Sequence, residues 1–211
     1  NDSATGGVVN KRFIENGHCI SIAKKYDLLH IQQSALEPIN TPKGNPHMRQ
    51  TDLIKRESKI QSLIARTYID PTGNSKLIQD GIVNIPEYIE APKKILWILK
   101  EAYCGGEELT GGGWSLQGCL DEKTDEWSRY TTFQPICYVS YGVLENKDNW
   151  DDMPWLKDSE AIRMCLRKVA FMNISKLPGY KTTANGRIHR AYEHYKEVIL
   201  KQIEPYDPDI I

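Results

Sequence analysis

The sequence predicts an α/β protein with a three-layer αβα arrangement around a central, mainly parallel sheet. Two short apolar runs, residues 95–99 and 169–172, have the length of buried strands. Helical patterns lie between and after them, and this alternation is typical of a parallel sheet with helical crossovers. A polar loop follows each run, so we expect the two loops to meet at one edge of the sheet.

Length and composition limit the class of protein. A chain of 211 residues with 40% hydrophobic content forms one substantial core, and its net charge of -1 gives no general attraction to polyanions. The five cysteines form no CxxC pair and no zinc pattern, which indicates free thiols in a reducing compartment. No run reaches membrane-spanning length and no signal peptide is visible, so we expect a cytoplasmic protein without a membrane partner.

The first part of the chain is expected to be an arm, a helix and a connecting segment. Residues 1–50 are poor in apolar residues and interrupted by glycine and proline, which predicts an irregular N-terminal arm. A helix with Thr51 as its cap should follow. Its apolar stripe consists of Leu53, Ile54, Ile60, Leu63 and Ile64. Residues 76–92 are expected to be extended, since Pro86 and Pro92 would each interrupt a helix.

An acidic region separates the two predicted strands. Residues 121–160 contain ten acidic and four basic residues, and we expect a solvated face with long loops. Three tryptophans are expected to hold these loops to the core: Trp127, Trp150 and Trp155. Helices are predicted at residues 159–168 and 188–203. Residues 209–211 resemble the start of a third strand, so we expect the sequence to be part of a longer protein.

A basic stretch follows the acidic region. Residues 161–192 contain seven basic residues and no acidic one. We predict that four of the cations contact nucleic-acid phosphates: Lys176, Lys181, Arg187 and Arg190. The alternative is that cations such as Arg163, Arg167 and Lys168 simply occupy the wet face and C-terminal end of a helix, where positive charge suits the helix dipole.

Two motifs in this order resemble the uracil-DNA glycosylase superfamily. KEAYC, followed by GGEE, GGGW and Gly118, is similar to the branch that carries GEAPG. FMNISKLPG, followed by a basic loop and a helix ending in QIEPYDPDII, is similar to the N-x-x-K-x-x-P loop of that branch. The resemblance covers residues 93–211 and implies a uracil-DNA glycosylase-like α/β domain that continues beyond residue 211, preceded by residues 1–50 and 51–92.

The resemblance implies a DNA glycosylase that flips uracil or another modified base out of single- or double-stranded DNA and hydrolyses its N-glycosidic bond. Asn173 would read the base, since an amide can accept from uracil N3–H and donate to O4. Trp114 would stack on the base, and Tyr103, in place of a proline, would narrow the pocket. Glu101 would hold or polarise a water for attack on the anomeric carbon.

Each of these residues also has a plainer explanation. Asn173 is the kind of residue that forms a turn or caps a helix after a strand. Trp114 is equally suited to loop packing, and Glu101 to an exposed position. Ala102 stands where strongly active branches carry Asp or Asn, which predicts slow catalysis. A histidine-bearing motif of the family would lie beyond residue 211.

Other functions remain alternatives at this point. Ala102 and Tyr103 favour a non-catalytic member of the superfamily that binds nucleic acid or a nucleotide. A weaker alternative is a cysteine hydrolase that pairs Cys104 with His189 or His194. The cysteines do not fit the iron–sulfur pattern of the GEAPG branch, so we expect no cofactor and no metal.

Overall fold

The computed structural model describes residues 46–103, 110–180, 182 and 185–211. The chain divides into two compact units, Asn1–Gly44 and Asn45–Ile211, and all described residues belong to the second. The predicted N-terminal arm therefore lies almost wholly outside the described residues. Its expected boundary at residue 50 is wrong, because helix α4 already begins at Pro46.

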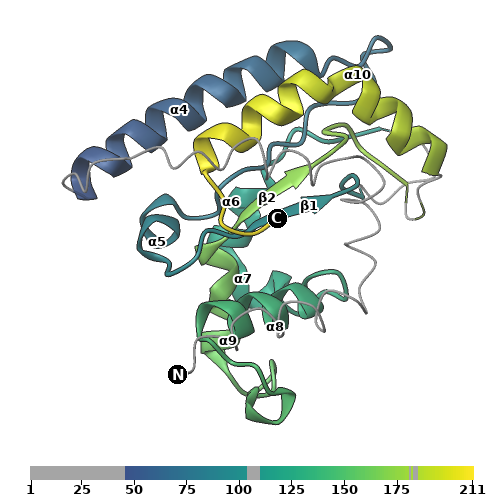
Figure 1. The fold of residues 1–211 in the computed structure, drawn as a ribbon. Helices are drawn as coiled ribbons and strands as arrows, with labels where there is room; N and C mark the ends of the chain where they lie inside the picture. Colours follow the sequence, from purple (N-terminus) through teal and green to yellow (C-terminus); the bar gives the residue numbers. More distant parts are fainter. Residues whose placement is uncertain (1–45, 104–109, 181, 183–184) are drawn as a thin grey trace, which may run out of the picture. The chain divides into compact units, whose positions relative to one another are not determined.

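A two-stranded parallel sheet joins the two apolar runs, as predicted (Figure 1). Strand β1 spans Leu96–Leu99 and strand β2 spans Ala170–Asn173, with Leu96 opposite Ala170 and Leu99 opposite Asn173. All four residues of β2 are buried, whereas the last three of β1 are half-buried. The first run is therefore less enclosed than its continuous apolar sequence suggests.

Single bridges extend this sheet on both edges. Ile210 pairs in parallel with Ile95, and the Leu96 amide donates to the Ile210 carbonyl at 2.9 Å. On the other edge Ile82 pairs antiparallel with Ala170. The predicted third strand is thus represented, in the described part of the chain, by one parallel bridge. The described part of the protein is a mixed α/β structure. The segment around Ile210 pairs beside the first strand, and the segment around Ile82 pairs beside the second.

Two long helices lie side by side along one face of the sheet (Figure 1). Helix α4 spans Pro46–Thr67 and helix α10 spans Asn185–Ile203. A small apolar cluster joins them, and it contains Ile60, Ile64, Tyr68 and Val198. The stripe predicted for the first helix is therefore largely correct, but Thr51 lies inside α4 and is not its cap. None of the described helices is long and apolar enough to cross a membrane.

Shorter helices cover the other face of the sheet and contribute most of the main core (Figure 1). They are α6 (Leu116–Glu122), α7 (Thr124–Trp127), α8 (Phe133–Leu144), α9 (Glu160–Met164) and the 3-10 helix η2 (Cys165–Lys168). The Phe171 ring of β2 meets Phe133 edge-on at 5.7 Å, and Trp97 Nε1 donates to Ser140 Oγ at 3.0 Å. Phe171 and Trp97 thus place the odd-numbered side chains of both strands on the α8 face.

Helices replace much of what was expected to be loop between the strands. The acidic region contains part of α6, all of α7 and α8, and the 3-10 helix η1 (Trp150–Asp152). Trp127 packs against the main core as predicted. Trp155 is 68% exposed, so the expectation that it holds a loop to the core is wrong. Trp150 is 52% exposed, but its ring centroid lies 4.9 Å from that of Tyr138, which packs against the main core.

The segment expected to be extended before β1 contains the helix α5 (Ile85–Glu90). Pro86 lies in the first turn, where proline needs no hydrogen-bond donor and its fixed φ suits the helix. Asn84 caps this helix, since its side chain accepts from the Glu87 amide. Pro86 therefore marks the start of a helix and does not interrupt one. A last 3-10 helix, η3 (Glu204–Tyr206), follows α10.

Substitution of two isoleucines of α4 tests which face of this helix packs against the rest of the protein. Ile64 is fully buried, whereas Ile54 is 46% exposed. We expect Ile64→Ala to lower the free energy of unfolding by about 2–5 kcal/mol, because it leaves a cavity. The same change at Ile54 should cost less than about 1 kcal/mol. Equal effects in chemical denaturation would contradict the described packing of α4.

Candidate functional site

The loops that follow β1 and β2 lie side by side, as the sequence predicts. The Ser175 amide donates to the Lys100 carbonyl at 2.9 Å, and the Gly179 amide donates to the Ala102 carbonyl at 2.8 Å. Tyr103 and Gly179 form a parallel bridge at the end of this pairing. The loop that carries Glu101 is thus fixed directly beside the loop that follows Asn173.

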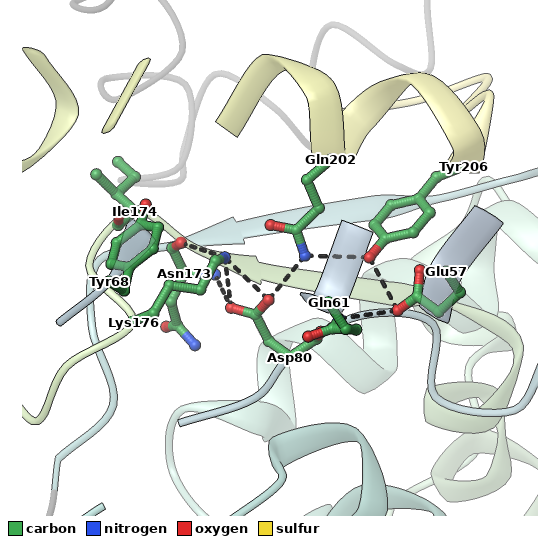
Figure 2. Close-up of polar contacts among 9 residues, drawn as sticks. All are labelled: Glu57, Gln61, Tyr68, Asp80, Asn173, Ile174, Lys176, Gln202 and Tyr206. Carbon is green, nitrogen blue, oxygen red and sulfur yellow. Dashed lines mark hydrogen bonds and ion pairs between the residues drawn. The ribbon is translucent and has the colours of Figure 1, made fainter. Parts of the chain in front are cut away.

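A buried ion pair clamps the backbone of Asn173 (Figure 2). Lys176 Nζ lies 2.9 Å and 2.8 Å from the two carboxylate oxygens of Asp80, and both side chains are fully buried. Asp80 Oδ2 also accepts a hydrogen bond from the backbone N–H of Asn173 at 2.6 Å. Lys176 Nζ donates to the Asn173 carbonyl at 2.8 Å. Both polar groups of the Asn173 backbone are therefore held by the same pair of charges.

Four further side chains connect this pair to α4 and α10 (Figure 2). Gln202 of α10 donates from Nε2 to Asp80 Oδ1 at 2.8 Å and contacts the Tyr206 hydroxyl at 3.0 Å. Tyr206 in turn donates to Glu57 Oε1 of α4 at 3.1 Å. Gln61 of α4 donates to the Asp80 carbonyl. One polar network therefore links both long helices to the end of β2.

Burial dominates the electrostatics of this network. It lowers the pKa of Lys176, and the Asp80 carboxylate opposes that shift. It raises the pKa of the Tyr206 hydroxyl, with the charges of Glu57 and Asp80 adding to the effect. Desolvation also raises the pKa of Glu57 to about 7, although hydrogen bonds from Gln61 and Tyr206 oppose this change. Glu57 thus titrates near neutral pH.

The side chain of Asn173 is buried, and its amide nitrogen has no hydrogen-bond partner among the described residues. Figure 2 shows the amide pointing away from helix α10. Strand alternation places it on the same face as Phe171, two residues earlier, and this face is covered by α8. An unpaired buried donor costs about 1–3 kcal/mol, so its presence calls for an explanation.

Trp114 lies on this same face of the sheet. Its ring centroid is 5.8 Å from that of Trp127, which contacts Phe133, the partner of Phe171. Trp114 is half-buried and packs against the main core. Its backbone carbonyl accepts from Gln79, the neighbour of Asp80, at 3.0 Å. Trp114 and Asn173 are therefore connected through adjoining segments.

Glu101 is held tightly in its loop. Only 1% of its side chain is exposed, and its Oε2 lies 3.3 Å from Arg187 Nη2. Arg187 also donates to the Pro178 carbonyl at 3.0 Å and lies over the Tyr180 ring. A Cβ at Gly179 would come within 2.2 Å of the Glu101 side chain, so only glycine leaves room for it. The exposed position considered for Glu101 is therefore wrong.

The four predicted phosphate contacts differ in their accessibility. The prediction is wrong for Lys176, because its ammonium is fully buried and bound to Asp80. Lys181 lies outside the described residues. Arg187 is half-buried in its ion pair with Glu101, and Arg190 is exposed on α10. Tyr103, predicted to narrow a pocket, is 52% exposed.

Sequence reasoning missed the residues that hold Asn173 in place. Asp80 was overlooked because the segment around it was expected to be a lead-in. A carboxylate between the apolar pairs Leu77–Ile78 and Ile82–Val83 is nevertheless the pattern of a buried charge. Glu57 and Gln61 follow each other at helical spacing beside the buried stripe of α4. Gln202 has no comparable signal in the sequence.

No group of three or more His, Cys, Asp or Glu side chains suited to a metal ion occurs within the described ranges. Cys104, the nucleophile of the cysteine-hydrolase alternative, lies outside them.

Comparisons with protein families, curated proteins and solved structures find no match to this chain.

The raised pKa of Glu57 predicts a pH dependence of stability. Its ordinary value is 4.5 and its value in the folded protein is about 7, so the folded state binds this proton more tightly. The resulting stability is complete below about pH 4.5 and is lost as the pH rises through about 7. A shift of this size corresponds to about 3 kcal/mol.

We therefore expect Glu57→Gln to remove this part of the pH dependence and to gain stability relative to the wild type between pH 5 and pH 8. Denaturant titrations across that range measure it. Glu90→Gln, at an exposed position, is the control and should leave the profile unchanged. A wild-type profile that Glu57→Gln does not alter would contradict the described burial of Glu57.

Proposed function

We propose that this chain is a DNA glycosylase-like protein with the three-layer αβα fold of the uracil-DNA glycosylase superfamily. It binds a base flipped out of DNA, uracil or another modified base, and hydrolyses its N-glycosidic bond. The observation that carries the proposal is the Asn173 side chain, which is buried at the carboxyl end of a parallel strand with an amide nitrogen that has no described partner. Ligands of open α/β sheets bind beyond such strand ends.

The clamp on the Asn173 backbone suits the task of reading a base. Recognition by one amide requires a fixed orientation, because its donor and acceptor must meet the complementary groups of the base. Asp80 and Lys176 fix both backbone groups of Asn173 without using its side chain. The amide is therefore available for a ligand and ordered before the ligand arrives, which lowers the entropic cost of binding.

The neighbouring loop supplies the group proposed for hydrolysis. Glu101 lies in the loop paired with residues 175–179, and Arg187 holds its carboxylate. In this proposal the carboxylate orients a water for attack on the anomeric carbon. Ala102 adds no second group to hold that water. Because a positioned acid–base group typically contributes about 10² to 10⁴ in rate, base release should be slow.

In the proposal the bound strand contacts basic residues that follow this loop in the sequence. In the proposal Arg190 and Lys181 contact phosphates, together with the outer part of the Arg187 guanidinium. Neutralising phosphates releases condensed counterions, so binding should weaken steeply with salt. Lys176 has no part in this contact, because it is buried.

A second candidate is a non-catalytic protein that binds a base or nucleotide at the same place. The ion pair between Glu101 and Arg187 favours it, because a buried carboxylate engaged by a cation is less free to hold a water. Ala102, next to Glu101, also favours the non-catalytic candidate, because alanine cannot hold a water. In both candidates Asn173 recognises the base. They differ only in whether the N-glycosidic bond is hydrolysed.

The experiment measures base release from single- and double-stranded oligonucleotides that carry uracil or common base modifications. We expect slow release by the wild type, with Asn173→Ala reduced at least tenfold and Glu101→Gln reduced by about 10². Asn74→Ala, an exposed asparagine, is the matched control and should match the wild type. Thermal unfolding of each variant separates loss of the site from loss of the fold.

Binding of the same oligonucleotides distinguishes the candidates. Salt-dependent binding that Asn173→Ala weakens, without release of any base, would support the non-catalytic candidate. If the wild type neither binds nor cleaves any of the oligonucleotides, the proposed function is wrong.

A further inference from the structure

A surface pocket lies on the α8 side of the molecule, in a part of the chain that the proposed base site does not use. It has a volume of about 160 Å³. Its lining residues are Tyr138, Trp150, Asp151, Met153, Pro154 and Trp155. Three of the six are aromatic, one is a carboxylate and none is basic. Its two tryptophans are more than half exposed, which is costly for such large apolar side chains in an unbound protein.

The walls of this pocket are anchored to helix α8. Trp150 meets the Tyr138 ring with centroids 4.9 Å apart. The Leu156 amide donates to the Tyr138 hydroxyl at 2.9 Å, so this ring is fixed to the segment that follows the pocket. Met153 lies directly over Gly142 of α8, where a Cβ would come within 2.6 Å of its methyl group. The exposed rings therefore belong to an ordered segment.

The charge around the pocket is negative. Residues 145–160 contain six acidic residues and two lysines. The nearby Arg163 is mostly buried, and its charge is paired with Asp125. An organic cation is the ligand that combines attraction to aromatic faces with attraction to a carboxylate. A neutral apolar ligand would gain nothing from Asp151.

We propose that this pocket binds an alkylated ammonium group, held against the faces of Trp150 and Trp155 and paired with the Asp151 carboxylate. Alkylation matters because methyl groups weaken the hydration of the ammonium and fill an aromatic cage. An unmodified lysine ammonium is more strongly hydrated and should bind more weakly. The same head group occurs in free quaternary amines such as choline and in trimethyllysine side chains.

Binding is tested by calorimetry or tryptophan fluorescence with the complete chain. The probes are choline, its uncharged isostere 3,3-dimethylbutanol, and one peptide in unmodified and trimethyllysine forms. We expect choline and the trimethyllysine peptide to bind with a Kd of about 1 mM or tighter. The isostere and the unmodified peptide should bind at least about threefold more weakly.

Variants localise the binding to this pocket. Trp155→Ala and Asp151→Asn should each weaken binding about 2- to 30-fold, and the exposure of Trp155 means that its loss leaves the fold intact. Asp152→Asn makes the same charge change one residue away, outside the lining, and should change the Kd less than twofold.

Comparing the affinities of the trimethyllysine peptide and choline shows whether the natural ligand is a protein side chain or a free amine. A trimethyllysine peptide that binds at least tenfold more tightly than choline identifies a protein partner, and equal affinity identifies the free amine; both support the proposal. It is overturned if neither cation binds, if the isostere binds as well as choline, or if Trp155→Ala leaves binding unchanged.

Discussion

The buried ion pair between Asp80 and Lys176 is the interaction on which the rest of the described structure depends. A charge removed from water costs several kcal/mol, so such a pair persists only with close geometry and further hydrogen bonds. Both conditions are met, since Asp80 also accepts from Asn173 and Gln202, and Lys176 also donates to a carbonyl. The pair joins the end of β2 to α10, and the Asp80 carbonyl joins it to α4.

The same pair supports the base-reading role that we propose for Asn173. Its backbone is satisfied entirely by Asp80 and Lys176, so nothing requires its side chain to contribute to the fold. The side chain is buried and points away from α10, and its amide nitrogen has no hydrogen-bond partner within the described structure. In the proposed function, stability and ligand recognition are thus divided between the backbone and the side chain of one residue. The lysine expected to contact phosphates is part of the support beneath the site.

Local patterns predicted the sheet and much of the helical arrangement. The apolar runs fixed both strands and their parallel pairing, because only buried strands of that length fit between helical segments. Helix α8 was missed because most of its residues are apolar, which weakens the contrast between its two faces, and α5 was missed because Pro86 was interpreted as a breaker. The Asp80 network joins residues more than ninety positions apart, and no local pattern encodes such pairing.

The central claim is tested most directly by a double-mutant cycle on the ion pair. Lys176→Met leaves the Asp80 carboxylate buried and uncompensated, and Asp80→Asn does the same to the ammonium, so each should lower the free energy of unfolding by about 3–5 kcal/mol. The double variant should lose much less than the sum of the two single losses. Arg56→Met, which breaks the exposed pair with Asp52, is the control and should cost less than about 1 kcal/mol. Single variants at positions 80 and 176 that cost no more than this control, or that add without coupling, would contradict the account.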